Sequence, residues 1–257
     1  MENPSKSLSR SAIVLRAGLV MAIGVALSYG IPIALSDIGA GAWAKATLGA
    51  HGFYEIYIAA GFAGVLIAAM AMQRMGPLRA LEALGIANIA PLGCVLALAA
   101  MAAAIATLLY ARARYQAADG AELLLFGIVG PFVEEVFFRG FLFRQMRKWA
   151  GAPFIVAALL SSLLFGAGHF DQGSSLADSL MNAGVTFLGG VLLSWLVERW
   201  GSIWPGFIVH AGLNVVWTVF ALGDNAVGGS AGNIARLATV VIVLAGTAML
   251  ARSERPA

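Results

Sequence analysis

LLLFGIVGPFVEEVFFRGFLF, residues 123–143, has the length and apolar character of a membrane span but carries three ionisable side chains, Glu134, Glu135 and Arg139. About 20 predominantly apolar residues are needed to cross the hydrocarbon core of a bilayer. An ionised side chain inside that core costs about 3 kcal/mol or more, so such residues usually have a function. Two adjacent carboxylates are difficult to explain as packing, and they indicate a functional site within the membrane.

The rest of the chain has the same apolar character. Of its 257 residues, 60% are hydrophobic and 11% are charged, whereas soluble domains carry roughly 25% charged residues. Only short linkers separate the apolar runs, which leaves no room for a soluble domain. The sequence therefore predicts an all-α polytopic membrane protein with about eight transmembrane helices, near residues 13–35, 54–73, 87–110, 122–143, 153–170, 178–198, 203–222 and 234–251.

The polar residues divide the chain into three parts. Residues 1–121 contain three spans without a motif, residues 122–222 contain the four spans in which buried polar residues concentrate, and residues 223–257 contain a loop and the last span. We expect the first span to stay uncleaved, because its apolar run is longer than that of a signal peptide. Cys94 is the only cysteine, so no intrachain disulfide can form.

The basic residues outside the spans predict the orientation. With the N-terminus in the cytoplasm, eleven lysines and arginines fall on the cytoplasmic side and four on the other side. Such an excess is typical of cytoplasmic segments, so we expect both termini in the cytoplasm. The composition, rich in Ala and Gly, suits a bacterial inner membrane. The eleven residues are Lys6, Arg10, Arg16, Arg74, Arg79, Arg144, Arg147, Lys148, Arg199, Arg252 and Arg255.

The polar residues of the fourth span fall on two helix faces. Successive residues are about 100° apart around a helix, so Glu134 and Glu135 cannot point the same way. Glu135 and Arg139 are four residues apart, which predicts an ion pair on one face. Such a pair can also simply specify helix packing. Glu134 has no partner on its own helix and is the stronger functional candidate, and Pro131 favours a kink just before it.

Two of the three histidines also lie in apolar runs. His169 ends the fifth span, and His210 shares a face of the seventh span with Asn214 because four residues separate them. Asn214 can bond an imidazole nitrogen of His210 or donate its amide to an oxyanion. An interface histidine and an interhelical polar clamp are the structural alternatives. However, Glu134, His169 and His210 each need a buried polar partner, and each can serve the others.

These residues can activate water in two ways. Glu134 can act as general base while His169 holds the water, and His210 and Asn214 can then stabilise the oxyanion. Alternatively, the two histidines and the glutamate can bind zinc and leave one position for water. Both chemistries predict hydrolysis of a peptide or amide bond. The chain has no His-Glu-x-x-His motif, which argues against a conventional zincin. No cofactor is favoured, and zinc is left open.

Three motifs in this order resemble a known protease family. They are Glu134-Glu135-x-x-x-Arg139, Phe165-x-x-x-His169 and His210-x-x-x-Asn214. The set resembles the CPBP family of CAAX prenyl proteases and bacteriocin-processing enzymes, also called Abi, over about residues 122–222. The resemblance implies an intramembrane endopeptidase with a CAAX-protease-like helical core, of a family described both as metalloproteases and as metal-free glutamate proteases. It also implies the residue roles: Glu134 activates water with His169 as its partner, Glu135 and Arg139 support the site, and His210 and Asn214 stabilise the oxyanion.

We expect Glu134, His169, His210 and Asn214 to converge on one cavity that opens to the cytoplasmic half of the membrane. With straight helices their depths do not agree. At about 1.5 Å per residue, Glu134 and His210 lie about 14 Å and about 11 Å from the cytoplasmic ends of their spans, but His169 lies about 24 Å away. A fourth helix that continues past Phe143, a later start of the fifth helix, or a steep tilt would bring them together.

A membrane carrier, such as a proton-coupled transporter, is the main alternative to an enzyme, because buried Glu, His and Arg side chains also build proton relays. Inverted repeats would favour a carrier, and the sequence shows none. A scaffold that uses its polar cluster only to hold helices together is a third interpretation. As partners we expect the lipid bilayer and a membrane protein or peptide substrate, and no nucleic acid. The sequence specifies neither the substrate nor the oligomeric state.

Overall fold

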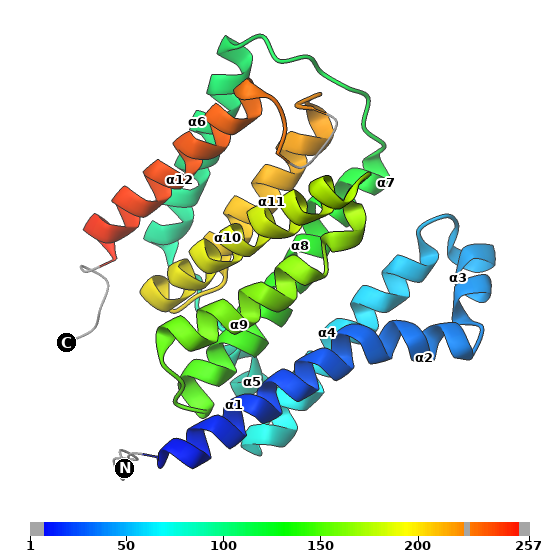
Figure 1. Cartoon of the computed structure of the whole chain (residues 1–257), viewed down its shortest axis with the longest axis vertical. Coiled ribbons are helices and arrows are strands. Elements are labelled where there is room, and N and C mark those ends of the chain that lie inside the picture. Colours follow the sequence, from blue (N-terminus) through cyan, green and yellow to red (C-terminus); the bar gives the residue numbers. More distant parts are fainter. Residues whose placement is uncertain (1–7, 224–226, 252–257) are drawn as a thin grey trace.

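A computed structural model describes residues 8–223 and 227–251, and this part of the chain is all helical apart from one isolated bridge between Tyr115 and Phe220 (Figure 1). The helices form one bundle, in which some are interrupted by π-helical turns, named η. The elements are α1 (Arg10–Val25), η1 (Ala26–Gly30), α2 (Ile31–Asp37), α3 (Ala40–Leu48), α4 (Gly52–Gln73), α5 (Pro77–Ala83), α6 (Pro91–Tyr110), α7 (Gly120–Glu122), η2 (Leu123–Val129), α8 (Gly130–Glu134), η3 (Glu135–Phe143), η4 (Gln145–Trp149), α9 (Phe154–Ala167), the 3₁₀ turn η5 (Phe170–Gln172), α10 (Leu176–Trp200), α11 (Trp204–Val219) and α12 (Ser230–Leu250).

Six helices of the described part are long and apolar enough to cross a membrane, which confirms an integral membrane protein. They agree with six of the eight predicted spans. The other two predicted spans, 122–143 and 203–222, carry the buried polar residues, and the structure gives them a different form. The first lies inside a longer helix with π-helical turns, and the second is the 16-residue α11. The number eight is therefore not confirmed.

We call residues 120–149 the central helix, because they run without a break from α7 to η4 through the middle of the bundle. Its η3 segment is almost completely enclosed: eight of its nine residues are buried. The central helix continues six residues past Phe143. A longer fourth helix was one of the three arrangements that would bring the site residues to the same depth. Its π-helical turn η2 ends just before Pro131, where the missing N–H of proline was expected to disturb the helix.

The central helix is anchored at its C-terminal end by Arg144. The Arg144 side chain donates hydrogen bonds to the carbonyl oxygens of Ala83 at 2.9 Å, Gly201 at 3.0 Å and Glu82 at 3.3 Å. One cation therefore joins the central helix to the end of α5 and to the turn after α10. Backbone carbonyls at helix ends lack partners within the helix, so a buried guanidinium is well suited to satisfy them.

Two further contacts bring α1 and α4 to the same end of the bundle. Arg16 of α1 donates to the carbonyl of Trp149 at 3.1 Å and lies 5.1 Å from the centre of its ring. Gln73, the last residue of α4, donates to the buried Gln145. The start of α1 and the ends of α4, the central helix and α10 thus meet at one end of the bundle. We call this the basic end, because Arg16, Arg74, Arg79, Arg144, Arg147, Lys148 and Arg199 lie on these segments.

The opposite end of the bundle, which we call the open end, contains α2, α3, the start of α4, the start of the central helix and the turn after α9. Figure 1 shows α2 and α3 diverging there from α7 and α8. Aromatic contacts connect the two sides, since Phe126 of η2 packs against His51 and Tyr54 with ring centres 5.4 Å and 4.7 Å apart.

Candidate active site

Glu135 and Arg139 form the predicted ion pair. Arg139 Nη1 lies 3.1 Å from Glu135 Oε1, and the two side chains are 1% and 0% exposed. The guanidinium carbon of Arg139 also lies 4.2 Å from the centre of the Phe165 ring, which stabilises the cation through the negative face of the aromatic system. The pair is completely removed from lipid and water, so each charge depends on the other.

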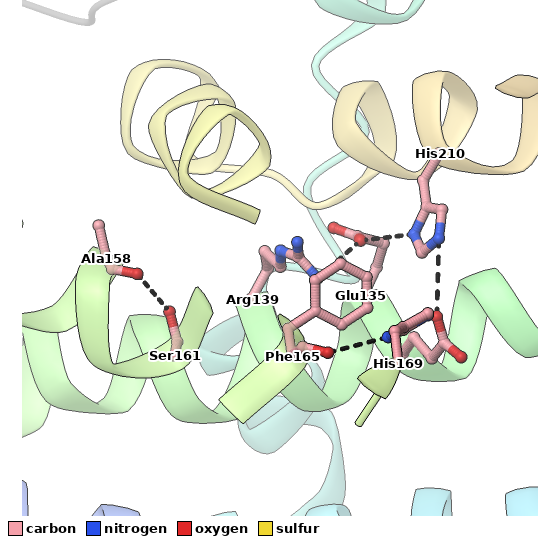
Figure 2. A network of polar contacts seen from close by, with 8 residues as sticks. Glu135, Arg139, Ala158, Ser161, Phe165, His169 and His210 are labelled. Carbon is pink, nitrogen blue, oxygen red and sulfur yellow. Dashed lines mark hydrogen bonds and ion pairs between the residues drawn. The ribbon is translucent and has the colours of Figure 1, made fainter. Parts of the chain in front are cut away.

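Glu135 also holds His210 of α11. Figure 2 shows Glu135 between Arg139 and His210, with His210 Nδ1 2.9 Å from Glu135 Oε1. A carboxylate only accepts hydrogen bonds, so Nδ1 of His210 carries the hydrogen. Gly206 of α11 lies against the same carboxylate, since a Cβ at that position would be 3.4 Å from Glu135 Oε2, in van der Waals contact. Glu135, and not Asn214, therefore fixes the tautomer of His210.

Glu134 lies on a different face, as predicted, and is 32% exposed. It has no partner on its own helix, but its Oε2 lies 3.6 Å from His210 Nε2. This distance is longer than a normal hydrogen bond. His210 therefore stands between the two glutamates, bonded to Glu135 and next to Glu134.

His169 reaches the same region from the turn after α9. Its Nδ1 lies 2.8 Å from the carbonyl oxygen of Phe165. A carbonyl oxygen only accepts, so Nδ1 carries the hydrogen and the neutral imidazole presents an unprotonated Nε2. Figure 2 shows His169 bonded to Phe165 beside the Glu135 network.

The hairpin of the central helix and α9 explains why Glu134 and His169 lie at the same depth. Glu134 is fifteen residues before Trp149, where the central helix ends, and His169 is fifteen residues after Phe154, where α9 begins. The mismatch in depth arose because the fourth predicted span ended at Phe143, whereas the central helix continues to Trp149.

A cavity of about 420 Å³ lies between the first span, α4, α8 and α9, and both Glu134 and His169 line it. Most of its wall is apolar, and three tyrosines, Tyr29, Tyr54 and Tyr57, contribute phenols. These tyrosines lie on the parts of the first span and of α4 that are far from the basic end. The cavity therefore extends from the middle of the bundle to the open end. In this structure the cavity lies toward the open end, so an opening to the cytoplasmic half and a cytoplasmic basic end do not fit together. The orientation of the bundle in the membrane decides between them, and the opening toward the cytoplasmic half stays a prediction.

Asn214 occupies a different position from the other site residues. Its amide nitrogen donates to the carbonyl oxygen of Phe126 at 3.1 Å, which connects α11 to η2. Asn214 and His210 are not among the residues that line the cavity. Overall, the structure brings Glu134, Glu135, Arg139 and His210 into one network and places His169 across the cavity from α4, while Asn214 lies one helical turn beyond His210.

The side chains of the site can be compared with those that a zinc site requires. Within residues 8–223 and 227–251, no three His, Cys, Asp or Glu side chains are arranged to hold a metal. Nδ1 of His169 and Nδ1 of His210 are both bonded, to Phe165 and Glu135. In this arrangement the side chains do not fit a two-histidine, one-glutamate zinc site, which requires three donors directed at one point.

The sequence did not single out the tyrosines of the cavity. They lie outside the three motifs, on spans in which the sequence shows no motif. The spacing of Tyr54 and Tyr57 puts both phenols on one face of α4. Paired tyrosines on one face of a predicted span are the signal that could have identified this wall.

The described part is thus a helical membrane bundle with a buried Glu–Arg–His network next to a cavity. Comparison with protein families gives this site its class: residues 116–216 match the model of the Rce1-like family of type II CAAX prenyl endopeptidases. The matched segment contains all six candidate residues, and it confirms the resemblance inferred from the motifs. Comparisons with curated proteins and with solved structures gave no match.

Proposed function

We propose that the protein is an intramembrane endopeptidase that hydrolyses a peptide bond of a membrane-associated protein or peptide through a water molecule activated by Glu134 and His169. The observation that carries this proposal is that both side chains line one cavity, next to the buried network of Glu135, Arg139 and His210. The match of residues 116–216 to CAAX-type endopeptidases supports the general class.

Glu134 is the proposed general base. Its carboxylate oxygen can accept a proton from water as the water oxygen attacks the substrate carbonyl. The unprotonated Nε2 of His169 accepts the second hydrogen of the same water and so orients it. The proton taken by Glu134 then passes to the leaving amine nitrogen as the C–N bond breaks.

His210 and Asn214 are the proposed partners of the developing oxyanion. His210 Nε2 lies 3.6 Å from Glu134 Oε2. To stabilise an oxyanion this nitrogen must carry a hydrogen, so the ring acts in its doubly protonated form, with Nδ1–H on Glu135. The amide of Asn214 has two N–H donors, of which one is used by the carbonyl of Phe126. The second is available for a substrate oxygen. Glu135 and Arg139 orient His210 and do not take part in bond making.

We further propose that the reaction needs no metal, since no three His, Cys, Asp or Glu side chains of residues 8–223 and 227–251 are arranged to hold one. Zinc content and chelator treatment of the purified protein test this. Activity should persist after dialysis against a chelator. Stoichiometric zinc, with activity lost to the chelator and restored by zinc, would establish the metallo mechanism instead.

The basic end is proposed to face the cytoplasm, following the excess of basic residues there. With that orientation the cavity opens in the half of the bilayer away from the cytoplasm. A reporter fused after Ala257 should be cytoplasmic, whereas a substituted cysteine at Tyr29 should be labelled by a membrane-impermeant thiol reagent from the outside. A periplasmic reporter would reverse both assignments.

The function itself is tested by comparing membrane peptides of cells that carry the intact protein with those of cells that carry Glu134→Gln. Gln keeps the shape of the side chain but cannot take a proton. Peptides that depend on the intact protein should disappear with the variant. The same peptides in both samples would exclude a Glu134 protease, and proton flux in liposomes without cleavage would favour a carrier. A quenched peptide that ends in a prenylated Cys-aliphatic-aliphatic-X sequence tests one substrate class directly.

A further inference from the structure

Tyr54 comes from α4, outside the segment that matches the protease family. Its side chain lines the cavity together with Glu134 and His169. The same cavity thus holds the Tyr54 phenol and the two side chains that are proposed to bind the water.

The central helix has a recess that fits the hydroxyl of Tyr54. A Cβ added at Gly130 would overlap the Tyr54 hydroxyl oxygen, so the absence of a side chain there makes room for the phenol. Gly130 is four residues before Glu134 and therefore lies on the same face of the helix, one turn away. The Tyr54 hydroxyl is consequently held about one helical turn from the Glu134 side chain, and the Tyr54 ring is fixed by its contact with Phe126 at 4.7 Å between centres.

The oxyanion needs such a donor. His210 uses one nitrogen on Glu135, and its other nitrogen faces Glu134. Asn214 has given one N–H to Phe126. Phe126 connects the two residues, because its ring contacts Tyr54 and its carbonyl oxygen accepts from Asn214.

We propose that Tyr54 is a further catalytic residue, whose phenol donates a hydrogen bond to the substrate carbonyl oxygen as that oxygen becomes negative. The inference rests on the proposed endopeptidase function and adds to it a residue from the N-terminal spans. A donor that acts on the developing charge lowers the barrier and leaves ground-state binding nearly unchanged.

Tyr54→Phe tests this proposal, with Tyr110→Phe as the matched control. Tyr110, the exposed last residue of α6, does not line the cavity and loses the same hydroxyl. The probe is a quenched peptide that spans a cleavage site found in the membrane peptide comparison, assayed with the full-length protein in detergent. Tyr54→Phe should lower kcat about 10²-fold with KM unchanged, and Tyr110→Phe should leave kcat within about threefold.

Binding of the same peptide to the Glu134→Gln variant gives a second measurement, because this variant binds without cleaving. Adding Tyr54→Phe to it should leave the Kd unchanged. An unchanged kcat for Tyr54→Phe, a change in KM alone, or an equal loss in Tyr110→Phe would overturn the role of Tyr54. If no Glu134-dependent cleavage is found at all, the endopeptidase function itself fails, and the Tyr54 proposal fails with it. If cleavage is found but Tyr54→Phe keeps the wild-type kcat, only the role of Tyr54 fails.

Discussion

The central helix and the first span differ in what surrounds them. In η3, eight of nine residues are buried, including Glu135 and Arg139. In the first span, Arg10–Asp37, only 11% of its most apolar window is buried, and residues such as Val14 and Leu15 are 71% and 76% exposed. The two helices are both apolar in sequence. Glu135 and Arg139, which lie in the middle of an apolar run, are thus enclosed by protein and not by lipid.

The largest effect is expected from Glu134, the one acidic residue of the central helix that faces the cavity. Glu134→Gln should lower peptide cleavage by at least about 10³-fold, because the base is lost while the shape is kept. Glu55→Gln on α4 is the control, since Glu55 lines an open apolar groove against η2 and should change the rate by no more than about twofold. An equal loss of cleavage rate in both variants would contradict a special role for Glu134.

Arg139→Ala tests the enclosure of the central helix through stability. The change leaves Glu135 buried without its cation, which should lower the free energy of unfolding by about 3–5 kcal/mol. Chemical denaturation in detergent, followed by tryptophan fluorescence, measures it. A variant that unfolds at the wild-type denaturant concentration would show that lipid or water reaches Glu135.

Two leucines compare the enclosed and lipid-facing surfaces without any charge. Leu142 of η3 is completely buried and packs against Gly24 of α1, whereas Leu163 of α9 is 61% exposed. Leu142→Ala should cost about 2–4 kcal/mol because it leaves a cavity. Leu163→Ala should cost no more than about 0.5 kcal/mol. The same denaturation assay decides, and similar costs for both would remove the distinction between the two surfaces.

The smallest effect is expected for the ion pair of Arg147 and Glu198 at the basic end, whose side chains are 24% and 26% exposed. Water can replace either partner there, so Arg147→Ala should cost about 0–1 kcal/mol. Its denaturation curve, measured beside that of Arg139→Ala, compares two ion pairs that differ mainly in burial. A loss as large as that of Arg139→Ala would mean that burial does not set the strength of these pairs.

The sequence predicted the apolar spans well because hydropathy alone defines them. It also predicted the Glu135–Arg139 pair, since a spacing of four residues on a helix decides that contact. It ended the central helix too early, because Arg144, Gln145, Arg147 and Lys148 read as a polar loop. In the structure, Gln145 and Met146 are buried and Arg144 donates to backbone carbonyls. Contacts with other helices therefore keep this segment helical, and a hydropathy pattern does not show such contacts.

The contacts between helices could not be predicted from the sequence. Nothing in the order of residues shows that His210 Nδ1 meets Glu135, or that Asn214 donates to Phe126 and not to an imidazole. The short helices α3 and α5 were missed because they are too short to cross a membrane. Tyr54 was missed because a tyrosine in an apolar helix usually only packs. It became visible when the structure placed Gly130 against its hydroxyl.

The bonds of Arg144 have a mechanical consequence. One side chain joins α5, the central helix and the turn after α10 at a single point. At the other end, the start of α4 meets the central helix through the rings of Tyr54 and Phe126. Ring contacts lack the directional hydrogen bonds of a guanidinium, so we expect any separation of α4 from the central helix to begin there. We therefore expect backbone amides near Ala83 and Gly201 to exchange hydrogen slowly. A cross-link between α4 and η2 should prevent that separation and leave the contacts of Arg144 unchanged.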